Sequence, residues 1–519
     1  MRLFITILLF LLHSLTLINS QTIKNVPCQF DIYDDFYTCY LEVVNITSPL
    51  DRLNFTGEHL EGFSNENVKA IRTSHVGSSP IINLIHEQFF EEFPNLQELL
   101  IRNTQLQTLN LENCEKITKI ISYQNPLTEL PEETFKNCVI LKSLDLWYNQ
   151  IDQTNEKSFS GLKSLEYLKI WGNTKVDIFT NSLADSENLR EFYFIGNGTI
   201  EVGALNSLKS LEILEISQNG LQFSQVQNLL NADVHVNLSS INLSENNFGS
   251  VDFQFFVQFK KLERLVLDEN FLTSVPVGAF DGFSSLTYLS LDNNWIAALD
   301  GNSLRGLSNL RTLWLSGNAI GSLNSHQFRH LNELTELHLS FNPQQSLASD
   351  IFVNNTKLQL LNLVGCKLKS IEVKTFEPLE QLQQLNLDFN QLQILPVDIF
   401  AIHSKLEFLS LTKNSINSLS LSSFGNLTQL TTLLVNENQI KEIEPKLFEK
   451  FPKLSYFGAT GNECIKKSIE KFNENEDLNE CHENWENERT ITTTANGNKL
   501  KIEMILIFIA IIFVNLMRN

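Results

Sequence analysis

The sequence predicts an α/β solenoid in which short parallel strands stack into a long sheet. Three observations predict it. A nine-residue pattern, L-x-x-L-x-L-x-x-N, recurs along most of the 519 residues. Twelve of the sixteen intervals between its starts are 24 residues long, and a phenylalanine follows eighteen residues after most starts. A constant period of this length is typical of repeat architectures, in which one supersecondary unit is copied many times.

Seventeen units fit the pattern. The ninth position is Asn in fourteen of them, and Val76, Thr104 and Cys366 fill it in the others. The spacing is irregular between Leu189 and Leu238, where the intervals are 22 and 27 residues and the phenylalanine is missing. The units begin at Val68, Leu96, Ile117, Leu141, Leu165, Leu189, Leu211, Leu238, Leu262, Leu286, Leu310, Leu334, Leu358, Leu382, Leu406, Leu430 and Leu454.

Each part of the pattern has a physical role. In a strand with the sequence L-x-L the two leucines point to one side, so they form the core and the residues at positions three, five and seven face outward. One unit cannot bury its leucines alone, but stacked units share a core. The ninth-position Asn turns the chain out of the strand, and its amide can pair with buried backbone groups. The phenylalanines, ten between Phe135 and Phe448, are expected to stack as a buried aromatic spine.

Over residues 68–462 the motif resembles the extracellular leucine-rich-repeat family with typical 24-residue repeats. The pattern is similar to that of connectin- and chaoptin-like surface proteins and of Toll-type ectodomains. The resemblance implies a curved leucine-rich-repeat horseshoe with a concave parallel β-sheet, about 17 repeats and disulfide-capped ends. It also implies a binding protein rather than an enzyme.

Both ends of the chain carry targeting signals. Residues 1–20 have a positive charge at Arg2 and an apolar run to Leu12, which predicts a secretory signal peptide. Residues 501–519 are apolar but short for a membrane span, and the small residues Ala495, Asn496 and Gly497 precede them. This favours a glycolipid anchor attached at one of these three residues; a short span or an uncleaved tail on a secreted protein are the alternatives.

These signals and the repeats predict the domain organisation. Every boundary follows from a change of pattern or composition. The parts are a signal peptide (1–20), an N-terminal cap (21–67), the solenoid (68–462, irregular near 189–238), a C-terminal cap (463–485), a polar linker with the anchor site (486–500) and a hydrophobic tail (501–519).

Cysteines stand where the caps belong. Cys28 and Cys39 precede the first repeat, and Cys464 and Cys481 follow the last, so we expect one disulfide in each pair. The family typically caps its ends in this way, though commonly with four cysteines at an end. Cys114 and Cys138 each lie three residues before a repeat start, which places them in adjacent turns. A disulfide and two buried thiols are equally compatible with that position.

The outward positions predict a binding site. In units three to six they hold Tyr123, Trp147, Tyr167, Lys169, Trp171 and Tyr193, which we name the aromatic patch. Since neighbouring strands lie about 4.8 Å apart, these side chains would form one contiguous exposed surface. Aligned but unrelated surface rings are the alternative. Trp314 belongs to a second, weaker patch with Tyr288 and His338.

Composition excludes several functions. The net charge of −21 disfavours contact with nucleic acid. The chain has no P-loop, G-x-G-x-x-G, G-x-S-x-G or C-x-x-C motif, and His326 and His330 lack the glutamate of a zinc protease, so we expect no catalytic residue, cofactor or metal. Candidate glycosylation sites are Asn45, Asn54, Asn237, Asn242, Asn354 and Asn426. A seventh sequon, at Asn197, occupies a ladder position, so we expect this Asn to be buried and unmodified.

We therefore expect a non-catalytic receptor or adhesion protein on the extracellular face of the plasma membrane, or secreted. Its partner would be a protein, either a second copy of the chain or another molecule, or an extracellular ligand. The alternatives are an innate-immune recognition protein or co-receptor and a secreted matrix or regulatory binding protein. The fold alone cannot decide among them, because the same solenoid serves all three.

Overall fold

The computed structural model describes residues 23–465 apart from Val43, 74–79, Asn110 and Asn324, together with 469–470, 478 and 480–485. The predicted signal peptide, polar linker, anchor residues Ala495–Gly497 and hydrophobic tail lie outside the described residues. The chain divides into two compact units. Among the described residues, the first extends to Val251 and also contains Phe255–Asn270, and the second contains Asp252–Gln254 and resumes at Phe271.

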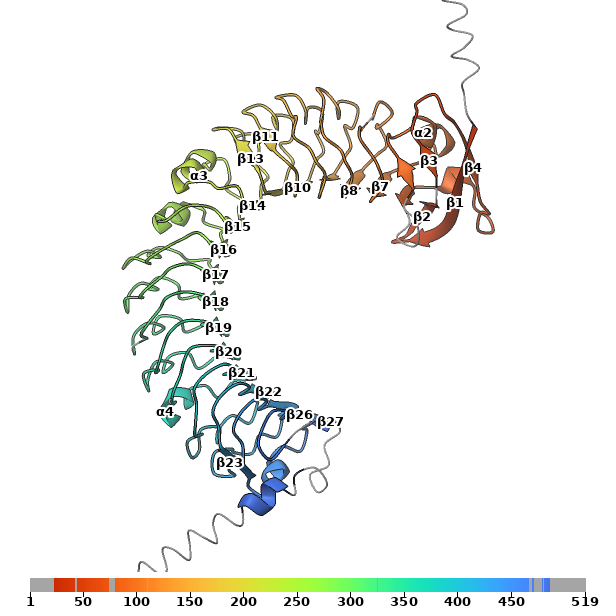
Figure 1. Cartoon of the computed structure of the whole chain (residues 1–519). Coiled ribbons are helices and arrows are strands. Elements are labelled where there is room, and N and C mark those ends of the chain that lie inside the picture. Colours follow the sequence, from red (N-terminus) through yellow and green to blue (C-terminus); the bar gives the residue numbers. More distant parts are fainter. Residues whose placement is uncertain are drawn as a thin grey trace, which may run out of the picture. The chain divides into compact units, whose positions relative to one another are not determined.

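The first unit is a parallel-strand solenoid, as predicted (Figure 1). Each of its nine repeat starts is followed by a strand, and strands of neighbouring repeats pair in parallel. These strands are β5 (Ala70–Thr73), β7 (Glu98–Arg102), β8 (Lys119–Tyr123), β9 (Ser143–Asp145), β10 (Tyr167–Trp171), β12 (Glu191–Ile195), β14 (Ile213–Ser217), β15 (Ser240–Asn242) and β16 (Arg264–Val266).

The N-terminal cap of this unit covers the first edge of the sheet. Strands β1 (Ile23–Tyr33) and β2 (Phe36–Leu41) form an antiparallel hairpin, and β2 pairs in parallel with β5. The N-terminal half of β1, residues 23–27, pairs in parallel with β4 (Arg52–Thr56), whereas its C-terminal half pairs with β2. The hairpin thus satisfies the backbone groups that β5 would otherwise expose.

The second unit repeats the arrangement with eight parallel strands. At its C-terminal edge β27 (Ile469–Glu470) pairs antiparallel with the last of them. The eight are β17 (Tyr288–Ser290), β18 (Thr312–Trp314), β19 (Glu336–His338), β20 (Leu360–Asn362), β21 (Gln384–Asn386), β22 (Phe408–Ser410), β24 (Thr432–Leu434) and β26 (Tyr456–Gly458).

Short elements form the other side of the repeats (Figure 1). In the 27-residue repeat that starts at Leu211, the additional length contains helix α3 (Phe223–Leu229). The boundary between the two units lies near residues 251–271, however, and not within the irregular stretch 189–238. The remaining elements are β3 (Asn45–Ile46), η1 (Asn65–Asn67), β6 (Ile81–Ile82), α2 (Gln88–Glu92), β11 (Val176–Ile178), β13 (Gly198–Ile200), η2 (Phe253–Gln258), α4 (Val373–Phe376), β23 (Ser418–Leu419), β25 (Glu442–Ile443) and η3 (Leu447–Lys450).

The core of each unit consists of the repeated leucines and the predicted aromatic spine. All ten spine phenylalanines are buried. The Phe135 and Phe159 rings of the first unit stack 6.3 Å apart between centroids, and Phe328 and Phe352 of the second stack at 6.1 Å. Burial of all ten rings confirms the predicted aromatic spine, and these two pairs show rings of adjacent turns stacked on one another.

The ninth-position asparagines form a hydrogen-bonded ladder. Nδ2 of Asn318 donates to the carbonyl oxygens of Leu291 (2.9 Å) and Leu315 (3.0 Å), while its Oδ1 accepts the Ile296 N–H (3.0 Å). One buried amide thereby pairs with backbone groups of its own turn and the preceding turn. Because a buried peptide group without a partner is costly, this explains why Asn recurs at the position.

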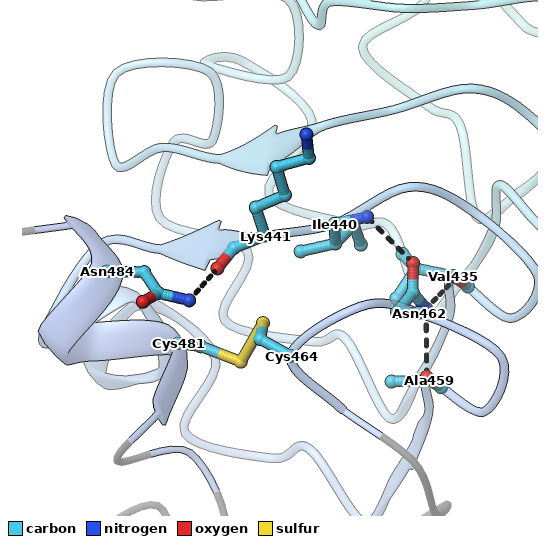
Figure 2. The surroundings of a disulfide bond; sticks show 8 residues. All are labelled: Val435, Ile440, Lys441, Ala459, Asn462, Cys464, Cys481 and Asn484. Carbon is cyan, nitrogen blue, oxygen red and sulfur yellow. Dashed lines mark hydrogen bonds between the residues drawn. A yellow bond between two sulfur atoms is a disulfide. The ribbon is translucent and has the colours of Figure 1, made fainter. Parts of the chain in front are cut away.

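Disulfides lie near both ends of the solenoid, as predicted, between Cys28 and Cys39 and between Cys464 and Cys481. Figure 2 shows the second one beside the last ladder residue, Asn462, whose amide donates to Val435 O (2.9 Å). Residues 480–485 are helical, and they place Cys481 over the final turn.

Cys114 and Cys138, for which the sequence left a disulfide and two thiols open, are joined by a disulfide. Both side chains are fully buried, and their Cα atoms lie 4.7 Å apart in adjacent turns of the first unit. Cys366 has a free, buried thiol that occupies a ladder position.

Candidate ligand-binding face

Along each strand of the first unit, successive side chains point alternately into the core and toward the concave face. In β10, Leu168 and Ile170 are buried, whereas Tyr167, Lys169 and Trp171 are partly exposed. The parallel register carries each position into a row across the sheet, so that Lys169 lies opposite Asp145 on one side and Tyr193 on the other. The aromatic patch therefore occupies one face, as the alternation predicted.

Two stacked tryptophans form the centre of the patch. The Trp147 and Trp171 rings lie 5.1 Å apart between centroids and 8° from parallel. The Lys169 ammonium lies 4.5 Å from the Trp147 centroid and 5.2 Å from the Trp171 centroid. A cation over an aromatic face is attracted by the ring quadrupole, so Lys169 is held against the pair. The result is a partly exposed aromatic surface with a positive charge held against it.

Tyrosines extend this surface on both sides. Tyr123 lies 4.8 Å from Trp147 between ring centroids, and Tyr167 lies 5.4 Å from Tyr193. The Tyr193 hydroxyl donates to Glu191 Oε2 at 2.9 Å. Burial, together with the hydrogen bond to Glu191, raises the pKa of Tyr193 far above its usual value, so this hydroxyl stays a donor at physiological pH.

The sequence prediction missed Tyr148, which belongs to the same surface. Its ring lies 5.2 Å from Trp171 and 5.4 Å from Trp147 between centroids. It stands at position eight of its repeat, beyond the strand, with a left-handed backbone (φ +50°). The prediction covered only the outward positions three, five and seven. The glycine at position eight of the next repeat, Gly172, is the sequence signal that could have revealed Tyr148.

Asp145 was also missed; it is a half-buried residue that lies opposite Lys169 on the same face of the sheet. Burial raises its pKa to about 6, and the nearby Lys169 charge opposes part of that shift. Its Oδ1 is buried without a hydrogen-bond partner in the described part of the chain, and so is Nε1 of Trp147. The patch thus contains one acceptor and one donor whose hydrogen-bonding capacity is unused.

Trp314, the remaining predicted ligand-binding residue, lies in the second unit. Its ring stacks on His338 with centroids 4.1 Å apart, and His338 Nε2 is 2.7 Å from Glu336 Oε1. Tyr288 lies 6.5 Å from Trp314 between ring centroids. These residues form a separate cluster, and a ligand-binding role for either group stays a prediction.

The sequons differ in exposure. Asn45, Asn54, Asn354 and Asn426 are exposed, whereas Asn237 and Asn242 are half-buried. The expectation that Asn197 is buried in the ladder is wrong, because the structure exposes it. In this 22-residue repeat, Gly196 adopts φ +114° and β13 begins directly after Asn197, so the residue leaves the ladder for the surface.

Within the described residues, no three His, Cys, Asp or Glu side chains gather in a way that could hold a metal ion. Nε2 of His330 lies 3.4 Å from Asn302 Oδ1, and the neighbouring Arg329 donates to the same oxygen. No helix in the part of the chain that the structure describes has both the length and the apolar character of a membrane span.

The model of the leucine rich repeat family matches residues 120–174, 236–296, 284–343, 334–392 and 404–463. Together these segments cover more than half of the chain. No curated protein sequence matches this chain.

Solved structures show the same fold. One is Toll, in the Toll–Spatzle complex described as a hub in Drosophila development and innate immunity: TM-score 0.57 and 20% identity over 76% of this chain and 54% of the Toll chain. A leucine-rich-repeat protein of Leptospira interrogans has a TM-score of 0.56 and 22% sequence identity, over 73% of this chain and 88% of that protein. TLR13, in a complex with single-stranded RNA, has a TM-score of 0.55 and 20% sequence identity, over 77% of this chain and 65% of the TLR13 chain. The chain thus spans about half the length of the Toll chain.

Proposed function

The chain belongs to the leucine-rich-repeat family, and from that premise we propose that it is a non-catalytic receptor that binds a protein partner on the concave face of its first unit. The aromatic patch carries the proposal. Trp and Tyr are enriched at the energetic centres of protein interfaces, where a few large, rigid side chains supply most of the affinity. Unpaired rings on a surface are ordinary, but the Trp147–Trp171 stack with Lys169 held against it is an organised surface.

A protein partner fits the chemistry of this surface. The patch combines apolar rings with a cation and the Tyr193 hydroxyl, so it can take up apolar and polar groups of a partner together. The strongly negative net charge of the chain makes nucleic acid an unsuitable ligand.

The decisive experiment identifies the partner and then removes one ring. We would fuse a peroxidase to the full chain, express it in cells and identify labelled neighbouring proteins, including a second copy of the chain. Binding of the labelled partner would then be measured for the wild type, for Trp171→Ala and for Trp295→Ala. Trp295 is a matched control because it is 62% exposed and belongs to the second unit.

We expect Trp171→Ala to weaken binding about 30-fold or more, the usual effect of losing a central interface tryptophan, and Trp295→Ala to leave it unchanged. Equal affinity of the wild type and Trp171→Ala, with similar thermal stability, would refute the proposal. Binding of a second copy would favour adhesion, whereas binding of a different protein would favour a recognition receptor.

The place of action forms part of the proposal. We propose that the chain works on the outer surface of the plasma membrane, held by a lipid attached near Ala495, Asn496 or Gly497. The three disulfides of the described residues support an oxidising compartment. Phosphatidylinositol-specific phospholipase C should release the full chain from intact cells. Retention on enzyme-treated cells, or spontaneous shedding from untreated ones, would contradict the lipid anchor.

A further inference from the structure

A pocket of about 190 Å³ lies on the concave face of the first unit, between the N-terminal hairpin and strands β5, β7 and β8. Tyr33 and Tyr40 line it from the hairpin, and the basic side chains of Arg72, Arg102 and Lys119 line it from the sheet. It is continuous with the aromatic patch, because Arg102 of β7 lies directly opposite Tyr123 of β8.

The hairpin turn positions one wall of the pocket. Asp34 and Asp35 both adopt left-handed backbone conformations, with φ of +49° and +66°, in a two-residue turn between Tyr33 and Phe36. Such turns match the twist of antiparallel strands and keep the hairpin in register. The Tyr33 ring consequently lies over the Arg72 guanidinium, 4.1 Å from its Cζ to the ring centroid.

The Arg72 side chain is largely removed from water, but not all of its hydrogen-bond donors have a partner among the described residues. Its side chain is 12% exposed and its Nη2 lies 3.3 Å from Oε2 of Glu98, which is itself 11% exposed. Nε of Arg72 is buried and has no hydrogen-bond partner among the described residues. A buried guanidinium is stabilised by anionic acceptors, and Glu98 contacts only one of its donor nitrogens.

The charged lining of the pocket is mainly basic. Three cations, Arg72, Arg102 and Lys119, line it beside one acid, Asp34 at the hairpin turn. Glu98 pairs with Arg72, and the charges of Arg102 and Lys119 also act on Asp145, which lies opposite Ile121 on β9. The chain as a whole carries −21. A positive site within a negative surface attracts a small anion but not an extended polyanion, which the surrounding surface repels.

The apolar residues of the pocket lining indicate which kind of anion fits. Leu100 occupies an outward-facing position of β7 yet is only 3% exposed, and Ile121 lies opposite it on β8. The methylene groups of an acidic side chain would pack on these two residues while its carboxylate meets the cations. The next residues of an extended peptide would then reach Tyr123 and the tryptophans of the patch.

We propose that this pocket binds a carboxylate side chain of an acidic peptide segment in the protein partner. The inference rests on the proposed function and adds the chemistry of the partner. Arg102 and Lys119 form the charge contacts, Arg72 is the desolvated anchor, and the aromatic patch takes the apolar residues that flank the acid.

The test selects peptides without assuming a sequence. Random dodecapeptides displayed on phage are selected on the full chain, purified in mild detergent with its C-terminal segment intact. The same selection is made on Arg102→Gln/Lys119→Gln and on Lys163→Gln, a control with an exposed lysine of the first unit outside the pocket lining. Arg72 is left unchanged, because its removal would strand the buried Glu98.

We expect Asp or Glu beside an aromatic or leucine residue to be enriched on the wild type and on Lys163→Gln, but not on the double variant. A selected peptide synthesised with Gln in place of its acid should bind at least 10-fold more weakly, and its affinity for the wild type should fall with added salt. No acidic enrichment, or equal binding of the Gln peptide, would overturn the inference. So would tighter, pocket-dependent binding of a heparin oligosaccharide, which would assign the pocket to a sulfated glycan.

Failure of this inference is distinguishable from failure of the proposed function. If the natural partner loses affinity with Trp171→Ala but not with Arg102→Gln/Lys119→Gln, the receptor function stands and the acidic-segment assignment falls. If neither variant changes binding of the partner, the concave face of the first unit is not the binding surface.

Discussion

Gly172 lies directly against the ring of Tyr148: a Cβ on this glycine would come within 2.4 Å of the Tyr148 Cδ1 atom. Gly172 also has a left-handed backbone, with φ +66°. The glycine therefore meets two requirements, one of backbone conformation and one of space. The missing side chain lets Tyr148 pack beside Trp171, so a residue outside the strand helps to shape the aromatic patch.

The first prediction concerns that close approach. Gly172→Ala should lower stability by about 1–2 kcal/mol for the left-handed backbone and by roughly 1 kcal/mol more for the clash with Tyr148. Gly220→Ala is the matched control, since Gly220 has φ +63° and nothing lies within 4 Å of its added Cβ. Thermal unfolding of the full chain measures both variants.

Removing the Tyr148 ring separates the cost of the left-handed backbone at Gly172 from the cost of the clash. In a Tyr148→Ala background, Gly172→Ala should cost no more than Gly220→Ala does, because the space is then free. Equal losses for the two glycine variants in the wild-type background would show that the Tyr148 contact does not constrain the backbone.

The sequence predicted the parts of the molecule that repeat. Leucine spacing alone placed a strand after every repeat start. Side chains alternate with a period of two within a strand, and the repeats recur about every 24 residues, so only one register between neighbouring strands satisfies both. The ladder was predictable for the same reason: an Asn such as Asn318 meets the same buried backbone groups in each turn.

Features that occur once were harder to predict. Tyr148 joins the patch only because its repeat is followed by Gly172, a relation between two turns that no single repeat reveals. Asn197 fits the ladder motif but lies in a shortened repeat, where β13 draws it to the surface. The basic pocket depends on how the cap hairpin lies over β5, and no periodic pattern describes a cap.

The second prediction concerns pH and Asp145. Its pKa in the folded protein is raised from 3.8 to about 6, so the folded state binds a proton more tightly than the unfolded state. This group therefore destabilises the protein above about pH 6, and the penalty disappears as pH falls toward 4. Asp145→Asn should raise the thermal midpoint at pH 7.5, by an amount equivalent to up to about 3 kcal/mol, and have little effect at pH 4.

Asp177 provides a control of opposite sign. Burial alone would raise its pKa, but hydrogen bonds from Thr199 and Lys175 outweigh burial and lower it. Asp177→Asn should therefore reduce stability at pH 7.5. Unfolding curves of both variants between pH 4 and 7.5 test the pair, and a destabilised Asp145→Asn at pH 7.5 would contradict the shifted pKa.

The third prediction compares two ladder positions in adjacent turns. Asn390 donates to Leu363 O (2.9 Å) and Leu387 O (2.9 Å) and accepts the Leu368 N–H (3.0 Å), all buried. Asn390→Ala leaves Leu363 O and Leu368 N–H without these partners, at a cost of about 3 kcal/mol.

Cys366→Ala is the control for this loss. The thiol makes only weak hydrogen bonds, to Leu339 O at 3.3 Å and to Val364 O at 3.8 Å, so its removal should cost only about 1 kcal/mol. Chemical denaturation measured by circular dichroism compares the two variants. A loss for Cys366→Ala as large as that for Asn390→Ala would mean that ladder positions are held by packing rather than by hydrogen bonds.

The fourth prediction concerns the disulfide inside the solenoid. Cys114 and Cys138 close a loop with a sequence separation of 24, so the bond should stabilise the chain by about 3 kcal/mol. A non-reduced proteolytic digest should contain the two cysteines in one linked peptide. Cys114→Ser/Cys138→Ser should unfold at a lower temperature, whereas finding both as free thiols in the purified full chain would contradict the pairing.

The fifth prediction concerns glycan occupancy. Asn197 is exposed in a sequon, whereas Asn242 is half-buried on the concave face, where its Oδ1 accepts the Ser244 N–H at 3.0 Å. An exposed side chain is reached more readily by the transferase, so glycopeptide mass spectrometry of the full chain should find Asn197 more heavily occupied than Asn242. Asn197→Gln should reduce the mass by one glycan, and Asn242→Gln should change it less. A fully occupied Asn242 would place a sugar on the concave face beside the aromatic patch and restrict the length of partner that the face can hold.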